Sequence, residues 1–128
     1  MPDTHLDLLD KPIVVQLATV MADGQPQVTP VWASRHGEEV WINTAIGRQK
    51  ERNLRVRPVA TVAVMDPGNP YRWLELRCRV RAVVEGEAAH AHIEALSQAY
   101  FGRPFGYNAP GEERIIFKLL PFRVYAGG

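Results

Sequence analysis

The chain has 128 residues, of which 46% are hydrophobic and 23% charged, a composition typical of one globular domain with a buried core. Its 15 basic and 14 acidic side chains nearly balance, which argues against a protein that binds nucleic acids or membrane surfaces through general charge. The single cysteine excludes an internal disulfide framework, the scattered histidines match no metal-ligand spacing, and no apolar run approaches the roughly 20 residues that span a bilayer. The acidic stretch MPDTHLDLLD does not resemble a signal peptide, so we expect a cytoplasmic, metal-free single domain over residues 1–128.

The first half of the chain predicts a short helix, two consecutive β-hairpins and a second helix. Asp3 or Thr4 is expected to cap the first helix. A β-branched apolar run predicts a buried strand, Asp23-Gly24 predicts a hairpin turn, and Pro30 places the next strand at an edge or a bulge. The two hairpins would form a meander, with strands at residues 13–21, 25–34 and 39–44 and the second helix at residues 45–56.

The second half predicts further strands around one amphipathic helix. The strand at residues 72–84 alternates, with Leu74 and Leu76 on one face and Arg77 and Arg79 on the other. PGNPY and GRPFGYNAPG are predicted loops, the helix is expected at residues 87–101, and the remaining strands at 59–66, 114–120 and 122–126. Six or seven antiparallel strands with few helices predict a mainly β (α+β) protein, in which a small barrel removes exposed sheet edges.

The stretch INTAIGRQKERNLRVRP concentrates positive charge in this nearly neutral chain, with bases at Arg48, Lys50, Arg52, Arg55 and Arg57. Arg48 and Lys50 fall at the start of the predicted helix, where cations oppose the helix dipole at a cost of a few tenths to about 1 kcal/mol each. A bound anion reverses the sign of this effect, because free N–H groups and cations then both point at it. With the hydroxyl of Thr44 at the preceding strand end, these two bases predict a phosphate site, which we call the anion seat (Thr44, Arg48, Lys50).

The same stretch is also compatible with a solvated helix face. Glu51 can pair with Arg55 four residues later, and runs of charge usually lie on the surface. No Walker loop and no GxGxxG motif is present, so the folds that bind nucleotides through those loops are not supported.

Residues for nucleophilic catalysis are sparse. No Ser-His-Asp signature or GxSxG motif occurs, and Cys78 falls on an apolar strand face, where an inert core thiol is expected. Glu112 and Glu113 are expected in an exposed turn. A phosphate site without a nucleophile suggests a cofactor that brings its own chemistry. The aromatic side chains near the anion seat could line a flat ring system, although tryptophans in a domain of this size more often belong to the core or an interface: Trp32, Trp41, Tyr71 and Trp73.

Four stretches together resemble the pyridoxamine 5′-phosphate oxidase-like split β-barrel proteins, and most of all their branch that uses the deazaflavin coenzyme F420. They are LATVMADGQPQVTPVW, VWINTAIGRQKERNLRVRPVATVAV, DPGNPYRWLELRCRV, and HIEALSQAYFG with PGEERIIFKLLPFRVY. The resemblance covers nearly the whole chain. It implies an antiparallel split β-barrel of six to seven strands with short flanking helices, and a homodimer that binds two cofactors in clefts between the subunits.

The resemblance also implies which residues contact the cofactor. Thr44, Arg48 and Lys50 would hold its phosphate, and the strand with Pro30, Val31 and Trp32 would run along the ring system. Tyr71, Arg72 and Trp73 would approach the other side of the cofactor, with Asn43, Arg52 and Asn53 as further contacts. Cys78 stands where the family often has glycine, which leaves the substrate identity open.

The function implied is hydride transfer between F420 and a small organic acceptor. No residue of the sequence stands out as a proton donor, which leaves solvent and Tyr107 in the predicted loop as candidates. FMN is the alternative cofactor, because the same seat serves either phosphate. A second class of function is a non-catalytic protein that binds a flavin, F420 or a tetrapyrrole. A third is an RNA or single-strand binder that would use Arg77, Arg79 and Arg81, but the nearly neutral chain argues against it.

Overall fold

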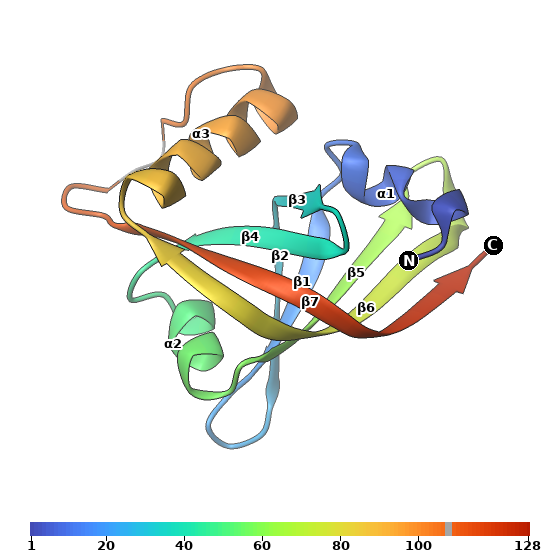
Figure 1. Ribbon diagram of the computed structural model, residues 1–128, viewed down its shortest axis with the longest axis horizontal. Coiled ribbons are helices and arrows are strands. Elements are labelled where there is room, and N and C mark those ends of the chain that lie inside the picture. The colour runs from blue at the N-terminus through green and yellow to red at the C-terminus, as the bar shows by residue number, and fades with distance from the viewer. Residues whose placement is uncertain (107–108) are drawn as a thin grey trace.

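Seven strands form a single antiparallel sheet that curls into a half-open barrel in the computed structural model, which describes residues 1–106 and 109–128 (Figure 1). The strands are β1 (Val15–Val20), β2 (Pro26–Val31), β3 (Ala33–His36), β4 (Glu39–Ala45), β5 (Val59–Asp66), β6 (Asn69–Glu85) and β7 (Arg114–Gly127). Their order across the sheet is β2-β1-β5-β6-β7-β4-β3. The predicted mainly β, antiparallel split barrel is therefore confirmed.

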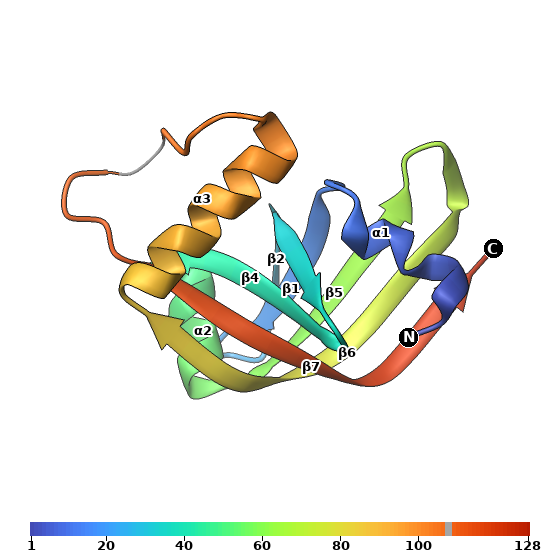
Figure 2. The ribbon, with the colours of Figure 1, turned by 45° about the horizontal axis from the view of Figure 1, so that its top comes forward.

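The helices are short and flank the sheet. They are the 3-10 helix η1 (Asp3–His5), α1 (Asp7–Asp10), α2 (Gln49–Val56) and α3 (Glu87–Phe101). Figure 2 shows α1 and α3 above the two ends of the open side of the curl. The expected N-terminal cap is wrong: Pro2 and Leu6 occupy the two N-cap positions and neither Asp3 nor Thr4 does.

The predicted meander is also wrong, because the predicted second strand divides at Trp32. Its first part, β2, pairs with β1 at one edge of the sheet, whereas β3 pairs with β4 at the opposite edge. Pro30 is tolerated in β2 because an edge strand need not donate every ladder hydrogen bond. Immediately after Trp32, the hydroxyl of Tyr100 in α3 accepts a hydrogen bond from the Ala33 amide at 3.2 Å. The crossing therefore places Trp32 beside α3.

The two final predicted strands are one continuous strand, β7, which pairs along most of β6. The sequence break was expected at Pro121, but this residue lies opposite Cys78 where the register between β6 and β7 shifts. Such bulges increase local bend and twist, and here they help two long strands to curl. The predicted PGNPY loop is likewise shorter, because β6 begins at Asn69 directly after the Pro67-Gly68 turn.

The core fills the inner side of the curl. The alternation of β6 is confirmed, with Leu74 and Leu76 fully buried and Arg77 and Arg79 exposed. Each such leucine contributes roughly 1.5–3 kcal/mol by leaving water. Cys78 is also fully buried, and burial raises the pKa of its thiol to about 12, which agrees with the expected inert core cysteine.

Candidate functional site

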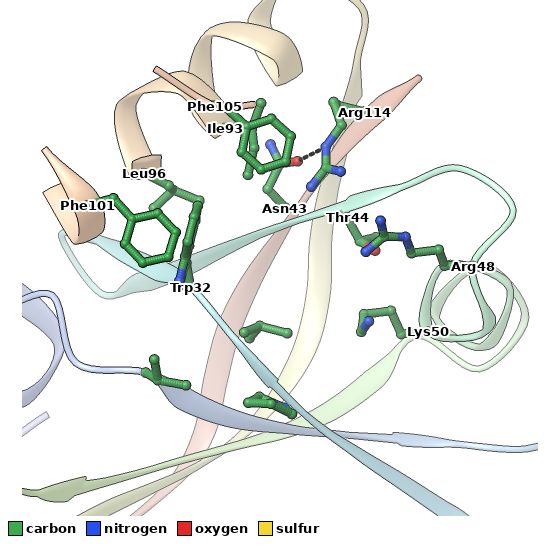
Figure 3. Close-up of a pocket in the computed structure, with 13 residues that line it drawn as sticks. Trp32, Asn43, Thr44, Arg48, Lys50, Ile93, Leu96, Phe101, Phe105 and Arg114 are labelled. Atoms are coloured by element: carbon green, nitrogen blue, oxygen red, sulfur yellow. Dashed lines mark hydrogen bonds between the residues drawn. The ribbon is translucent and has the colours of Figure 1, made fainter. Parts of the chain in front are cut away.

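One cavity of about 450 Å³ opens between the β2–β3 crossing, the end of β4, the start of α2, and α3 (Figure 3). Seven of the twelve residues that the sequence analysis selected line it: Pro30, Val31, Trp32, Asn43, Thr44, Arg48 and Lys50. Six further lining residues were not selected from the sequence: Val14, Ile93, Leu96, Phe101, Phe105 and Arg114. The sheet topology thus joins the anion seat to the strand that was expected to run along a ring system.

One side of the cavity is apolar and aromatic. The ring of Trp32 stacks on Tyr100 at 5.3 Å between centroids and meets Phe101 edge to face at 4.9 Å. Ile93 and Leu96 add the buried face of α3. Figure 3 shows this wall opposite the side chains of Thr44, Arg48 and Lys50. The cavity therefore offers an apolar surface to a flat ring and a cationic surface to an anion.

The cationic side is built where β4 turns into α2. Gly47 makes the turn with φ of 100°, a conformation that favours glycine, and Arg48 is the N-cap of the helix. The carboxylate of Glu51 accepts a hydrogen bond from the Gly47 amide at 2.7 Å, which fixes this helix start. Lys50 is half-buried, and burial lowers the pKa of its ammonium, with repulsion from Arg48 and Arg114 acting in the same direction. A bound anion would favour the charged ammonium and so oppose both effects.

Thr44 supplies an unsatisfied hydrogen-bonding group at the cavity. Its side chain is 2% exposed, and its Oγ1 is the one buried side-chain nitrogen or oxygen atom that finds no hydrogen-bond partner within residues 1–106 and 109–128. An unpaired buried hydroxyl costs about 1–3 kcal/mol. An anionic ligand oxygen would remove this cost, so the donor set of the anion seat fits a phosphate.

Arg114 is the polar lining residue that the sequence analysis missed. It is 7% exposed; its Nε donates to Asn43 Oδ1 at 2.9 Å and its Nη1 to Glu112 Oε2 at 3.1 Å. Glu112 also accepts from Arg48 Nη2 at 3.3 Å, and its side chain is only 9% exposed. The expectation of an exposed turn is therefore wrong for Glu112. An arginine at the first position of an otherwise apolar strand was the available signal.

A hydrogen-bonded chain leads from Asn43 away from the cavity. Asn43 Nδ2 donates to His92 Nδ1 at 3.1 Å, His92 Nε2 lies 2.9 Å from Ser34 Oγ, and Ser34 Oγ lies 2.8 Å from His36 Nε2. Since His92 Nδ1 accepts, its proton sits on Nε2 and points at Ser34. Burial, and then repulsion from His36, Arg114 and Lys118, lowers the pKa of His92 to about 4. A neutral His92 therefore orients Asn43, which in turn orients Arg114.

The other bases of the stretch do not line the cavity. Arg52 donates to the Gly47 carbonyl and to Gln49, Arg55 pairs with Glu51 at 2.7 Å and Glu85 at 3.3 Å, and Arg57 Nε donates to the Val20 carbonyl at 2.7 Å. Asn53 is fully buried and donates to Thr19 Oγ1 at 3.0 Å. Both interpretations of the stretch thus apply, each to a different part: the first two bases face the cavity, and the later ones stabilise the helix and its neighbours.

The segment of Tyr71, Arg72 and Trp73 lies at the far end of β6 and does not line this cavity within one chain. Tyr71 is 81% exposed, while the Arg72 guanidinium is engaged by Asp7 and by Asp66 at 3.0 Å. Trp73 borders a second, apolar groove that also includes Val14. Tyr107 lies outside the described residues.

Two other features bear on the alternative functions. Arg77 pairs with Glu75 at 2.7 Å and lies over the ring of Tyr125, and Arg79 lies over Phe122, so these arginines have partners within the sheet. Trp41 stacks on His36 at 3.6 Å rather than lining the cavity. In the part of the chain that the structure describes, no helix is long and apolar enough to cross a membrane, and no group of three metal-ligating side chains occurs.

The sequence profile of the family described as pyridoxamine 5′-phosphate oxidase matches residues 1–126. The chain belongs to this family. Among solved structures, a protein named F420 reductase is 34% identical, with a TM-score of 0.88 over 98% of this chain and 98% of that chain.

Two more distant solved structures share only their fold with this chain. A conserved hypothetical protein from Mycobacterium tuberculosis is 23% identical, with a TM-score of 0.79 over 99% of this chain and 84% of that chain. A putative pyridoxamine 5′-phosphate oxidase from Listeria innocua is 19% identical, with a TM-score of 0.71 over 97% and 95%. A comparison with functionally curated proteins found no match. Membership of the pyridoxamine 5′-phosphate oxidase family and the F420 reductase neighbour confirm the resemblance seen in the sequence.

Proposed function

We propose that this chain is an oxidoreductase that binds coenzyme F420 and transfers a hydride between the deazaflavin and a small organic acceptor. The observation that carries the proposal is the unpaired, buried Thr44 hydroxyl beside two cations at one end of a cavity whose other wall is aromatic. The similarity over 98% of the chain to a protein named F420 reductase supports the choice of cofactor.

Each wall of the cavity would hold a different part of the cofactor. Thr44, Arg48 and Lys50 would hold the phosphate, and the backbone of Pro30 and Val31 with the ring of Trp32 would border the ring system. The chemistry that F420 supplies when bound is hydride exchange at C5 of its ring. The chain itself contributes orientation and exclusion of water, which together can lower a barrier by several kcal/mol.

Contacts to the phosphate lie far from the reacting carbon and bind ground state and transition state equally. Such uniform binding lowers the dissociation constant of the cofactor without raising the rate of the chemical step. Loss of a seat side chain should therefore weaken cofactor binding more than it slows turnover of the loaded protein.

FMN is the alternative cofactor, because a phosphate seat and an aromatic wall suit either ring. A chain that binds F420 or FMN stoichiometrically but reduces no enone, quinone or imine-like acceptor would instead be a non-catalytic binding protein. Absorbance of the protein after equilibration with both cofactors separates the first pair, and an acceptor panel separates enzyme from carrier.

We further propose that the protein acts as a homodimer. Val14 lines both the cavity and the apolar groove that contains Met65 and Trp73, so the cavity is continuous with an exposed apolar surface. A second copy seated on this groove could bring its own Tyr71 and Trp73 to the cofactor, which one chain alone does not do.

Titration of intrinsic tryptophan fluorescence with F420 and FMN in parallel tests the proposal, since Trp32 lines the cavity. We expect saturable quenching by F420, and Lys50→Ala should raise the dissociation constant at least about tenfold, equivalent to about 1.4 kcal/mol. Lys11→Ala is the matched control, because it removes the same charge from a side chain outside the cavity. If Lys50→Ala binds F420 as tightly as wild type, the assignment of Lys50 to the anion seat is wrong. If the wild-type protein binds neither F420 nor FMN, the proposed function is wrong.

A further inference from the structure

Glu112 forms the only contacts from a carboxylate to the two arginines of the cavity within the described residues. Its Oε1 lies 3.3 Å from Arg48 Nη2 and its Oε2 lies 3.1 Å from Arg114 Nη1. Glu112 does not itself line the cavity; it borders a separate groove that Arg114 also lines. Its negative charge therefore acts on the anion seat through the guanidinium groups that face the ligand.

This arrangement sets the net positive charge on the polar side of the cavity. Arg48, Lys50 and Arg114 bring three formal positive charges to the polar side of the cavity, and Glu112 cancels one of them. The carboxylate is almost fully shielded from water, so salt screens it less than a surface charge. Repulsion between it and a ligand phosphate grows in proportion to the charge of that phosphate.

Phosphate esters differ in this property. A phosphate monoester carries about 1.5 to 2 negative charges near neutral pH, whereas a diester carries one. Glu112 therefore repels a doubly charged monoester more strongly than a singly charged diester.

We propose that Glu112 is a specificity-determining positioning residue, which lowers the positive charge of the anion seat and so reduces the advantage of phosphate monoesters over phosphodiesters. This inference rests on the proposed function, because it assumes that the seat holds a cofactor phosphate. It deepens that function by naming a residue through which the seat would distinguish a singly charged phosphate from a doubly charged one.

A purely structural role for Glu112 predicts a different effect of its removal on the two ester classes. If the carboxylate only held Arg114 in place, its removal would weaken the monoester at least as much as the diester, so the ratio of monoester to diester dissociation constants would stay the same or rise. Asn43 already orients the Nε side of Arg114, so the guanidinium keeps one of its two anchors without Glu112. The ratio of the two affinities is therefore the informative measurement.

The test uses two ligands with the same ring: the 5′-phosphate monoester of the deazaflavin riboside, and its methyl diester. Both are titrated by tryptophan quenching at fixed ionic strength and about pH 8, where the monoester is a dianion. The protein is compared as wild type, Glu112→Gln, Glu112→Ala, Glu112→Asp and Glu113→Gln. Glu113 is the matched control, because it is the exposed neighbour and its change alters net charge equally.

We expect Glu112→Gln and Glu112→Ala to lower the ratio of monoester to diester dissociation constants about fivefold relative to wild type. Glu112→Asp and Glu113→Gln should keep the wild-type ratio. Circular dichroism melting shows which variants are folded, and either neutral variant suffices for the comparison.

An equal change in both dissociation constants, or a rise in the ratio, would overturn the proposal for Glu112. A wild-type protein that binds neither ligand, nor F420 itself, would instead overturn the proposed function. The two failures are thus distinguishable in one set of titrations.

Discussion

Individual buried polar groups decide the chemistry of the cavity at the scale of single residues. Arg114 donates to Asn43 and Asn43 donates to His92, so each group has a partner that fixes its direction. The hydroxyl of Thr44 is the exception, since it is buried and unpaired within the described residues. One unpaired buried hydroxyl next to two cations supports the proposal that this end of the cavity binds an anion.

The lowered pKa of His92 predicts how stability depends on pH. The unfolded chain takes up a proton on this side chain near pH 6.5, whereas the folded chain resists it down to about pH 4. Between these values the unfolded state binds more protons, so the free energy of unfolding falls as pH falls. We expect His92 to account for a loss of about 2 kcal/mol between about pH 7 and pH 4.5.

Urea unfolding of wild type and His92→Gln at both pH values measures this loss. The variant should be less stable at neutral pH and should show a smaller fall toward acid, because its residue 92 does not titrate. Equal falls in the two proteins would show that other groups cause the acid sensitivity.

The start of α2 explains, at the scale of one element, why only some bases reach the cavity. The Gly47 turn and the Glu51 carboxylate fix the first residues of the helix, and this geometry presents Arg48 and Lys50 to the cavity. Asn53, one turn later, faces the sheet and anchors the helix to Thr19 of β1. Buried polar contacts therefore help to position the helix against the sheet.

Asn53→Ala should lower the free energy of unfolding by about 2 kcal/mol, because it removes a buried hydrogen bond and leaves Thr19 without that donor. Chemical denaturation measures the change. Gln49→Ala is the control, since Gln49 lies on the same helix, is less buried and contacts Asn53 and Arg52 rather than the sheet. A loss no larger in Asn53→Ala than in this control would contradict the anchoring role.

The whole molecule is organised by the crossing from β2 to β3, which carries the chain from one edge of the sheet to the other. The crossing places Trp32 against α3 and closes one wall of the cavity. On the side that includes Val14, the cavity borders an apolar groove in which Met65 is 53% exposed. Exposed apolar surface next to a ligand cavity is typical of a binding interface.

We expect the protein to be a dimer in solution, and Met65→Asp should raise its dissociation constant at least about tenfold, because the charge would be buried without a partner. Sedimentation velocity over a range of concentrations measures the change. Val56→Asp is the control, since Val56 is 71% exposed on α2 and lies outside the groove. If the two variants have the same dimer dissociation constant, the groove is not part of the interface.

The sequence by itself determined the features that depend on neighbouring residues. The alternation of β6, the bounds of α3 and the placement of Arg48 and Lys50 at a helix start follow from local periodicity and helix electrostatics. Of the seven selected residues that line the cavity, helix electrostatics pointed to Thr44, Arg48 and Lys50. Pro30, Val31, Trp32 and Asn43 were selected as cofactor contacts through the family resemblance.

Only the tertiary structure decided which distant segments meet. Arg48 and Glu112 are 64 residues apart in the chain and touch because β7 pairs with β4, a choice of register that no local pattern specifies. The separation of β2 from β3 at Trp32 and the continuity of β7 through Pro121 likewise depend on how the whole sheet curls. Local propensity acts within a few residues, whereas strand order and cavity shape result from burying all the apolar faces at once.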